Sequence, residues 1–193
     1  KPDIAMITNI GEAHIENFKN LNGIAKAKSE IIENIKEGGY LILDRDNKYF
    51  NYLSRRAKKK KINVLSFGKS NKASAKLIKN KLYNSYNSLH FRVLNKNIFL
   101  KVKNVNPLII SNILFTLLTI HILNLDFSKI IKLTNYFQLV EGRGKIQLIS
   151  RYKKKFQLID ESYNANPSSV KSAIINFSNI KRTYEKKFLL LGD

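Results

Sequence analysis

Short apolar runs alternate with helical repeats along the first 70 residues of the chain. Residues 3–8 and 40–43 are apolar runs of the kind found in buried parallel strands, and a polar loop follows each. Between them, residues 22–35 carry apolar side chains at helical spacing, with Asn22 as the expected N-cap. A helix, a basic turn and a strand follow within residues 49–67. This alternation predicts an α/β fold with a parallel sheet and helices on its faces.

The pattern changes in the middle of the chain. Residues 89–93 and 98–102 alternate between apolar and polar across a short polar turn, which predicts an antiparallel hairpin at the edge of the sheet. Residues 108–125 are strongly apolar, but six polar side chains interrupt them, so we expect a buried helix and not a membrane span. Residues 128–137 are expected to form a second helix.

The last third of the chain predicts a separate unit after a linker at residues 138–145. Three apolar runs are expected to be strands, and residues 168–180 repeat at helical spacing. The runs cover residues 146–149, 156–159 and 188–191. Residues 160–167, Asp-Glu-Ser-Tyr-Asn-Ala-Asn-Pro, lie between the second strand and the helix. Ligands bind at such strand ends in open α/β sheets, although a capped strand–turn–helix connection has the same pattern.

The formal charge of +21 is the first compositional feature that bears on function. Such a charge is typical of proteins that bind nucleic acid or anionic surfaces. However, Lys, Asn and Ile account for 76 of the 193 residues, and the lysines are spread along the chain apart from a basic run at residues 55–61. We therefore interpret the charge as a compositional bias on solvated faces and expect no nucleic-acid partner.

Other features of the composition narrow the class of protein. The chain has no cysteine, which excludes disulfides and thiolate metal sites. No signal peptide is visible at the N-terminus, and the chain begins directly with a predicted core strand, so we expect a fragment of a longer protein. The sequence contains no phosphate-binding Gly-x-x-x-x-Gly-Lys-Ser/Thr motif, no Gly-x-Ser-x-Gly and no zinc pattern.

Three residues are candidates for chemistry on their pattern alone. Lys28 falls within the apolar stripe of its predicted helix, where a desolvated amine becomes more reactive; alternatively, it lies at the edge of the stripe and extends to water. His14 follows a strand end between two glutamates and could ligate a metal or contact a phosphate. Arg143 lies between two glycines at the predicted domain junction, which suits a phosphate contact or an ordinary flexible linker.

Several stretches, taken in order, resemble the Mur ligases. They are residues 8–16, 25–31, 141–144, 160–167 and 190–193. The resemblance covers essentially the whole chain and is weakest in residues 48–106. Within the family, the Ser-Tyr-Asn-Ala-Asn-Pro core and the Gly-Glu-Ala-His-Ile-Glu loop favour the ligase that adds D-Ala-D-Ala to UDP-MurNAc-tripeptide through an acyl phosphate.

The resemblance implies a domain organisation. Residues 1–140 are expected to be the C-terminal part of the central ATP-binding domain, a partial parallel-sheet ATPase domain with an antiparallel hairpin edge. Residues 141–193 are expected to begin a Rossmann-like C-terminal domain. The P-loop and the regions that bind UDP and D-Ala-D-Ala lie outside such a fragment, so we expect it to be inactive alone.

The resemblance also implies the cofactors ATP and Mg²⁺ and a set of site residues. Lys28, as a carbamate, and His14 are the implied magnesium ligands, and both are implied to be catalytic together with Arg143. Two departures from the family pattern affect this set. Glu161 replaces a usual aspartate, and Leu108 and Ile109 replace a His-Asn pair that often precedes the adenine contact. The implied nucleotide-binding residues are Asn112, Arg143, Asp160, Glu161, Tyr163, Asn164 and Asn166.

The family further implies a cytoplasmic enzyme that is monomeric at full length, acts on small-molecule substrates and has no membrane span. Two other hypotheses remain open. One is a sibling Mur ligase or a folylpolyglutamate-type ligase. The other is a basic module that binds RNA or an anionic surface without catalysis.

Overall fold

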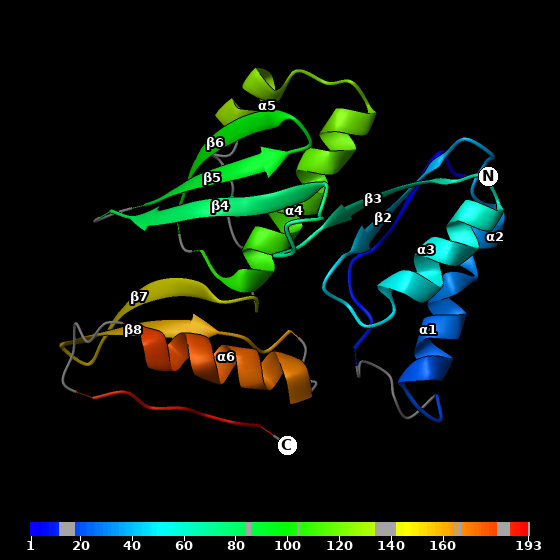
Figure 1. Cartoon of the computed structure of the whole chain (residues 1–193). Helices are drawn as coiled ribbons and strands as arrows, with labels where there is room; N and C mark the ends of the chain where they lie inside the picture. The colour runs from blue at the N-terminus through cyan, green and yellow to red at the C-terminus, as the bar shows by residue number, and fades with distance from the viewer. Residues whose placement is uncertain are drawn as a thin grey trace. The chain divides into compact units, whose positions relative to one another are not determined.

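The computed structural model describes residues 1–11, 18–83, 86–103, 105–133, 142–163, 165, 167–180 and 186–192 (Figure 1). Contacts within the chain divide it into two compact units, Lys1–Gln138 and Leu139–Asp193. The first unit contains a six-stranded sheet and the second a two-stranded sheet. The assignment of these units to two particular family domains stays a prediction.

The sheet of the first unit is parallel at one end and antiparallel at the other. Its strands are hydrogen-bonded in the order of the sequence, with parallel pairing from the first to the fourth and antiparallel pairing from the fourth to the sixth. This confirms the predicted α/β fold with an antiparallel hairpin at its edge. The strands are β1 (Ile4–Ile7), β2 (Tyr40–Asp44), β3 (Asn63–Phe67), β4 (Ala75–Leu82), β5 (Asn87–Val93) and β6 (Lys96–Val102).

Helices cover both faces of this sheet, as Figure 1 shows. Because side chains alternate along a strand, β2 contributes to two cores. Leu41 and Leu43 pack with the helices of one face, whereas Ile42 packs in the cluster that contains the long helix of the other face. The first face carries α1 (Leu21–Ser29), α2 (Ile31–Asn34) and α3 (Phe50–Lys59), and the second cluster includes residues of α4 (Pro107–Ile122) and α5 (Phe127–Leu133).

The first helix begins two residues earlier than its sequence pattern predicts. Asn20 has an extended backbone and accepts a hydrogen bond from the Gly23 backbone N–H at 3.1 Å, so Asn20 is the N-cap. The predicted cap, Asn22, lies inside the helix and accepts from the Tyr49 hydroxyl at 2.6 Å. The helical stretch also divides at Glu30 into α1 and α2. The contact with Tyr49 is long-range, and local pattern cannot reveal it.

The second unit is a hairpin followed by a helix. β7 (Lys145–Arg151) and β8 (Lys154–Asp160) pair antiparallel, and α6 (Pro167–Asn179) follows. The predicted strand at residues 188–191 is wrong, because no part of the described segment 186–192 is in a strand. An apolar run forms a strand only where a neighbouring strand supplies backbone partners, and its own sequence does not reveal that neighbour. Among the described helices of both units, none has the length and apolar character needed to cross a membrane.

Candidate functional site

Polar residues gather at the carboxyl edge of the parallel strands in the first unit. Because β1, β2 and β3 are parallel, the loops that follow them lie along the same edge of the sheet. Asn9 follows β1, residues 44–47 end and follow β2, and residues 68–70 follow β3. This edge is where an open α/β sheet binds its ligands.

Lys28 reaches this edge from α1. Its side chain is exposed, and its Nζ donates a hydrogen bond to the carbonyl oxygen of Asn9 at 2.8 Å. Neighbouring Ser29 and Ile24 are buried in the helix interface. Of the two alternatives that the sequence left open, the structure therefore favours the one in which Lys28 lies at the edge of the apolar stripe and extends to water. The amine is open to solvent and anchored beside the loop after β1.

Asn47 connects the loops that follow β1 and β2. Its Nδ2 donates to Asn9 Oδ1 at 3.3 Å and to the Ile10 carbonyl at 3.2 Å, while its Oδ1 accepts from the Tyr49 backbone N–H at 3.0 Å. Asn9 thus has contacts from both Lys28 and Asn47. The result is a hydrogen-bonded group at the edge of the sheet, built from three separate elements.

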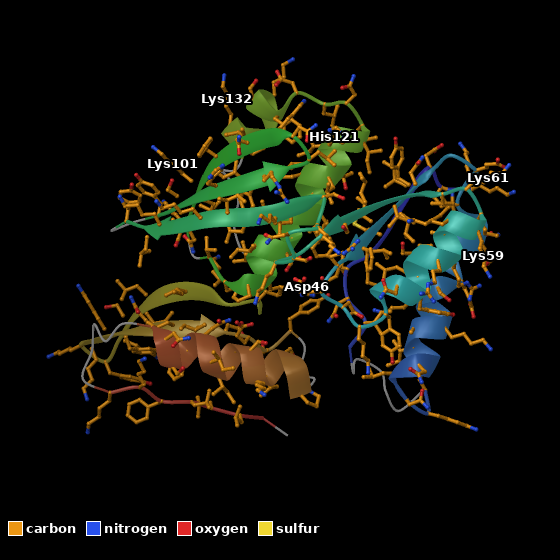
Figure 2. The ribbon with its side chains drawn as sticks, in the orientation of Figure 1. Asp46, Lys59, Lys61, Lys101, His121 and Lys132 are labelled. Atoms are coloured by element: carbon orange, nitrogen blue, oxygen red, sulfur yellow. The ribbon has the colours of Figure 1, made fainter. Side chains whose placement is uncertain are left out.

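Two aspartates at the end of β2 have different surroundings. Asp44 is partly buried, and this burial raises the pKa of its carboxyl group, with the nearby Asp46 charge adding to the effect. Asp46 (Figure 2) accepts hydrogen bonds from the backbone N–H groups of Lys69 at 2.5 Å and Ser70 at 3.1 Å. Asp46 therefore fixes the loop after β3.

Sequence reasoning did not name Asn9, Asp44, Asp46 or Asn47 as site residues. One feature of the sequence could have identified them: each residue lies at or shortly after the end of a buried apolar run. Their mutual contacts join segments that are up to 38 residues apart, which the pattern of any one segment does not encode.

The sequence analysis named two other residues of the first unit, His14 and Asn112. His14 lies outside the described residues. Asn112 lies in α4 with an exposed side chain, and its backbone carbonyl accepts from Thr116 Oγ1 at 2.8 Å. No contact in the described part of the chain connects Asn112 to Lys28. The predicted roles of His14 and Asn112 stay predictions.

The residues around Lys28 do not suit Mg²⁺ as they stand. Magnesium prefers oxygen ligands, and an ammonium group supplies a positive charge and only donors. Within the described ranges, no three His, Cys, Asp or Glu side chains lie close enough to hold a metal ion. Oxygen ligands at Lys28 require that its Nζ first become a carbamate, which carries a negative charge and two oxygen atoms.

In the second unit the structure brings together the two motifs that the sequence analysis singled out. The Gly144 backbone N–H donates to the Asp160 carbonyl at 2.7 Å, and the Tyr163 N–H donates to the Gly142 carbonyl at 3.2 Å. Both glycines have positive φ, +73° at Gly142 and +80° at Gly144. A Cβ atom at Gly142 would lie 3.0–3.3 Å from Tyr163 backbone and Cβ atoms, so a side chain there is disfavoured both by the positive φ and by close contact.

Arg143 is exposed on this pair of loops. Its guanidinium carbon lies 4.2 Å from the centre of the Tyr163 ring, a cation–π contact. Hydrogen bonds from Ser162 lower the pKa of Asp160, whereas burial and the neighbouring Asp160 charge raise the pKa of Glu161. The loop thus presents a positioned guanidinium and two carboxyl groups of different acidity.

The remaining predicted residues of this loop, Asn164 and Asn166, lie outside the described residues. For those that are described, the arrangement suits a phosphate group, since a guanidinium held by ring stacking keeps its N–H donors free to contact one.

Comparison with known proteins identifies a matching family and several similar proteins. Residues 1–120 match a family model described as the Mur ligase middle domain. The chain is 38% identical over 175 residues to a UDP-N-acetylmuramoyl-tripeptide–D-alanyl-D-alanine ligase of Rickettsia prowazekii. That match covers 90% of this chain and 38% of the relative, so the chain spans well under half of the relative's length.

Solved structures show the same fold. A MurF structure from Acinetobacter baumannii matches with a TM-score of 0.79 and 24% identity, covering 92% of this chain and 37% of that chain. A MurF ligase from Thermotoga maritima in complex with ADP matches with a TM-score of 0.75 and 25% identity, covering 92% of this chain and 39% of that chain.

Proposed function

The chain belongs to the Mur ligase family, and from this we propose that it is part of an ATP-dependent ligase that adds D-Ala-D-Ala to UDP-MurNAc-tripeptide in peptidoglycan precursor synthesis. The observation that carries the proposal is the 38% identity to the R. prowazekii ligase of that name across 90% of this chain. The T. maritima relative in complex with ADP supports ATP as the nucleotide.

The proposed reaction forms an amide bond in two steps. A carboxylate oxygen of the tripeptide attacks the γ-phosphorus of ATP, which gives an acyl phosphate and ADP. The amine of D-Ala-D-Ala then attacks the acyl carbon, phosphate leaves with the oxygen that came from the carboxylate, and the amine loses a proton. Because the transferred phosphoryl group carries negative charge throughout, the protein acts mainly through positioning and charge stabilisation.

Lys28 has the proposed role of a carbamate. Carbon dioxide adds to the neutral amine of Lys28 with loss of a proton, and the side chain changes from a positive to a negative charge. The exposed amine at the edge of the sheet is open to this reaction. The carbamate and His14 are the proposed holders of Mg²⁺, which supplies charge neutralisation at the transferred phosphate.

The second unit has the proposed role of a nucleotide contact. Arg143 offers N–H donors to the phosphates of ATP, and Tyr163 holds the guanidinium in place by stacking. The proposed nucleotide contacts from the loop after β8 are Asp160, Glu161, Asn164 and Asn166, and Asn112 of α4 is the proposed adenine contact. We assign residues 1–140 to the central ATP-binding domain and residues 141–193 to the C-terminal domain.

The proposal also covers the setting in which the enzyme works. The substrates are small molecules, the full-length protein is a monomer, and the reaction takes place in the cytoplasm, where ATP is available. Gel filtration of the full-length protein at its working concentration tests whether it elutes as a monomer.

A panel of amine acceptors tests the proposed specificity. The full-length protein that contains this chain is incubated with ATP, Mg²⁺ and UDP-MurNAc-tripeptide, and each assay adds D-Ala-D-Ala, D-Ala, L-Ala or D-Glu. ADP release is expected with D-Ala-D-Ala and at background level with the other acceptors. Turnover of UDP-MurNAc with L-Ala, or of a folate with glutamate, would instead assign the chain to a sibling ligase or a folylpolyglutamate-type ligase.

A further inference from the structure

The surface of the antiparallel strands β4–β6 that faces away from the buried core is basic. Leu89, Phe91 and Val93 of β5 point into the core, so the residues between them point outward. The strand register places a cation of β4 beside each of two outward residues of β5, with Lys79 opposite His90 and Lys76 opposite Arg92. On the other side of β5, Lys101 of β6 lies opposite Ser88, and Figure 2 shows Lys101 on this sheet.

This surface lies in a part of the sequence without acidic residues. Between Asn47 and Leu125 there are sixteen Lys or Arg residues and no Asp or Glu. The four ion pairs within the described residues all lie between residues 3 and 61, and their acidic partners are Asp3, Glu33 and Glu37. The lysines are spread evenly along the sequence, but the fold brings several of them together on one face of the sheet. No acidic residue lies near them in the sequence.

Two pairs of stacked aromatic rings lie among these cations. His90 and Phe99 are opposite each other on β5 and β6, with ring centres 4.4 Å apart and planes within 14°. Phe99 remains 61% exposed, which is unusual for a phenylalanine on a solvent-facing strand. Tyr83 and Tyr86 stack with ring centres 4.9 Å apart at the end of the β4–β5 hairpin.

Lysines lie against the second ring pair. Lys81 Nζ is 5.1 Å from the centre of the Tyr83 ring, and Lys101 Nζ is 5.3 Å from that of Tyr86. Tyr86 directly precedes β5 and His90 lies within it, four residues further along the chain, a separation of about 13 Å at the rise of a strand. Nucleotides in a stacked strand are about 3.4 Å apart, so a strand of roughly five nucleotides, with four spacings, covers both ring pairs.

We propose that this aromatic–lysine face, which comprises Lys76, Lys79, Lys81, Tyr83, Tyr86, His90, Arg92, Phe99 and Lys101, binds single-stranded nucleic acid. Its chemistry has the two parts that such binding requires. Cations contact the phosphates, and exposed rings stack on the bases without reading their sequence. An antiparallel sheet with exposed aromatic rings and a helix behind it also serves as the platform of many RNA-binding domains.

The residues around Phe99 favour a nucleic acid strand over a membrane surface as the partner that binds this face. A ring that inserts into a lipid interface is accompanied by other apolar side chains. Here Asn97 and Lys101 flank Phe99 on β6, and Asn97 Oδ1 shares a hydrogen bond of 2.9 Å with His90 Nε2. The proposal revises the sequence-based expectation of no nucleic-acid partner and is independent of the proposed ligase activity.

Fluorescence anisotropy with a labelled ten-nucleotide oligouridine tests the proposal on the full 193-residue chain, at several salt concentrations. Phe99→Leu keeps an apolar side chain but removes the ring. Loss of one stacked base weakens binding by about 5-fold to 150-fold and leaves the salt dependence unchanged. Lys79→Gln with Lys101→Gln removes two phosphate contacts, so the slope of log K against log salt falls by about 1.4.

The matched control removes the same charge elsewhere. Lys58→Gln with Lys59→Gln changes two exposed lysines of α3, and Figure 2 shows Lys59 on that helix. This control is expected to keep both the affinity and the slope of the unchanged chain. Circular dichroism checks that each variant is folded.

Two results would overturn the proposal. In the first, the α3 control lowers the slope as much as the Lys79 and Lys101 variant, which means that binding is spread over the whole charged surface. In the second, Phe99→Leu has no effect, and a ten-base-pair duplex or vesicles of phosphatidylglycerol bind as tightly as the single strand. The face would then be a general anionic-surface contact.

Discussion

Alanine substitution at three glycines tests how closely the two motifs of the second unit approach each other. Gly38, Gly142 and Gly144 all have φ between +73° and +80°, so alanine at each is strained by about 1–2 kcal/mol in the left-handed region. Their surroundings differ. Nothing lies within 4 Å of a Cβ at Gly38, whereas one at Gly144 would lie 2.8 Å from Glu161 Oε1 and one at Gly142 would lie 3.0 Å from Tyr163 Cβ and 3.1 Å from its backbone nitrogen.

These surroundings set the order of the three effects. At Gly144 the neighbour is the end of a flexible side chain, which moves away, so Gly144→Ala is expected to cost about 1–2 kcal/mol, like Gly38→Ala. At Gly142 the backbone of Tyr163 cannot move without breaking its hydrogen bond to the Gly142 carbonyl. Overpacking adds about 1–3 kcal/mol, so Gly142→Ala is expected to cost about 2–5 kcal/mol in total.

Native-state hydrogen exchange measures these effects separately for each unit. The Gly144 and Tyr163 amides report on the second unit, and the Gly39 amide reports on the first for the Gly38→Ala control. Protection is expected to fall by roughly 5-fold to 30-fold for Gly144→Ala and by at least about 30-fold for Gly142→Ala, since 1.4 kcal/mol is a factor of ten. Equal losses at Gly142 and Gly144, or a larger loss at Gly144, would refute the close approach of the two loops.

Three further predictions follow from the site. In the full-length enzyme, Lys28→Ala is expected to abolish ligation and added short carboxylic acids to restore part of it in a turnover assay; a wild-type rate would exclude the carbamate. Burial and the charge of Asp160 raise the pKa of Glu161 above its ordinary 4.5, so the folded state holds the carboxyl proton to a higher pH than the unfolded state does. The protonated carboxyl group therefore contributes to the stability of the folded state below pH 4.5. That contribution is lost as the pH rises through the folded pKa. Glu161→Gln is therefore expected to stabilise the second unit at pH 7 but not at pH 4, measured by hydrogen exchange; an equal gain at both pH values would contradict this reasoning. Asn47→Ala is expected to lower the free energy of unfolding, measured in urea, by about 1–3 kcal/mol, because two to three hydrogen bonds to the loops after β1 and β2 are lost. Asn47→Asp is expected to cost at least as much, since a carboxylate cannot donate to the two oxygen atoms that the Asn47 side chain faces.

Much of the fold could be predicted because its main elements are encoded locally. The run that forms β2 is continuously apolar, as a strand covered on both faces must be. The β5–β6 hairpin shows strict alternation, since α4 covers only one of its faces. The segment at residues 188–191 has the same apolar character as β1, yet it forms no strand. A strand depends on its partner, and the partner is not part of the local pattern.

The candidate site was predictable only in part, because its geometry depends on contacts between distant segments. The resemblance to the Mur ligases pointed to Lys28 and Arg143, but the helical pattern left open whether the Lys28 amine is buried or extends to water. The structure shows that the long side chain extends past the helix to the Asn9 carbonyl. The contact between Arg143 and Tyr163 joins the segment before β7 to the segment after β8, which meet at the open end of the hairpin. Neither segment alone indicates that they meet.

Transfer of an isotope label tests the central claim most directly. The full-length enzyme is given ATP, D-Ala-D-Ala and UDP-MurNAc-tripeptide whose terminal carboxylate is labelled with ¹⁸O, and the released phosphate is analysed by mass spectrometry. An acyl phosphate carries one carboxylate oxygen into the leaving phosphate, so we expect phosphate with one ¹⁸O, formed only when D-Ala-D-Ala is present. Unlabelled phosphate, label in AMP, or label release with a different acceptor would contradict the proposed function.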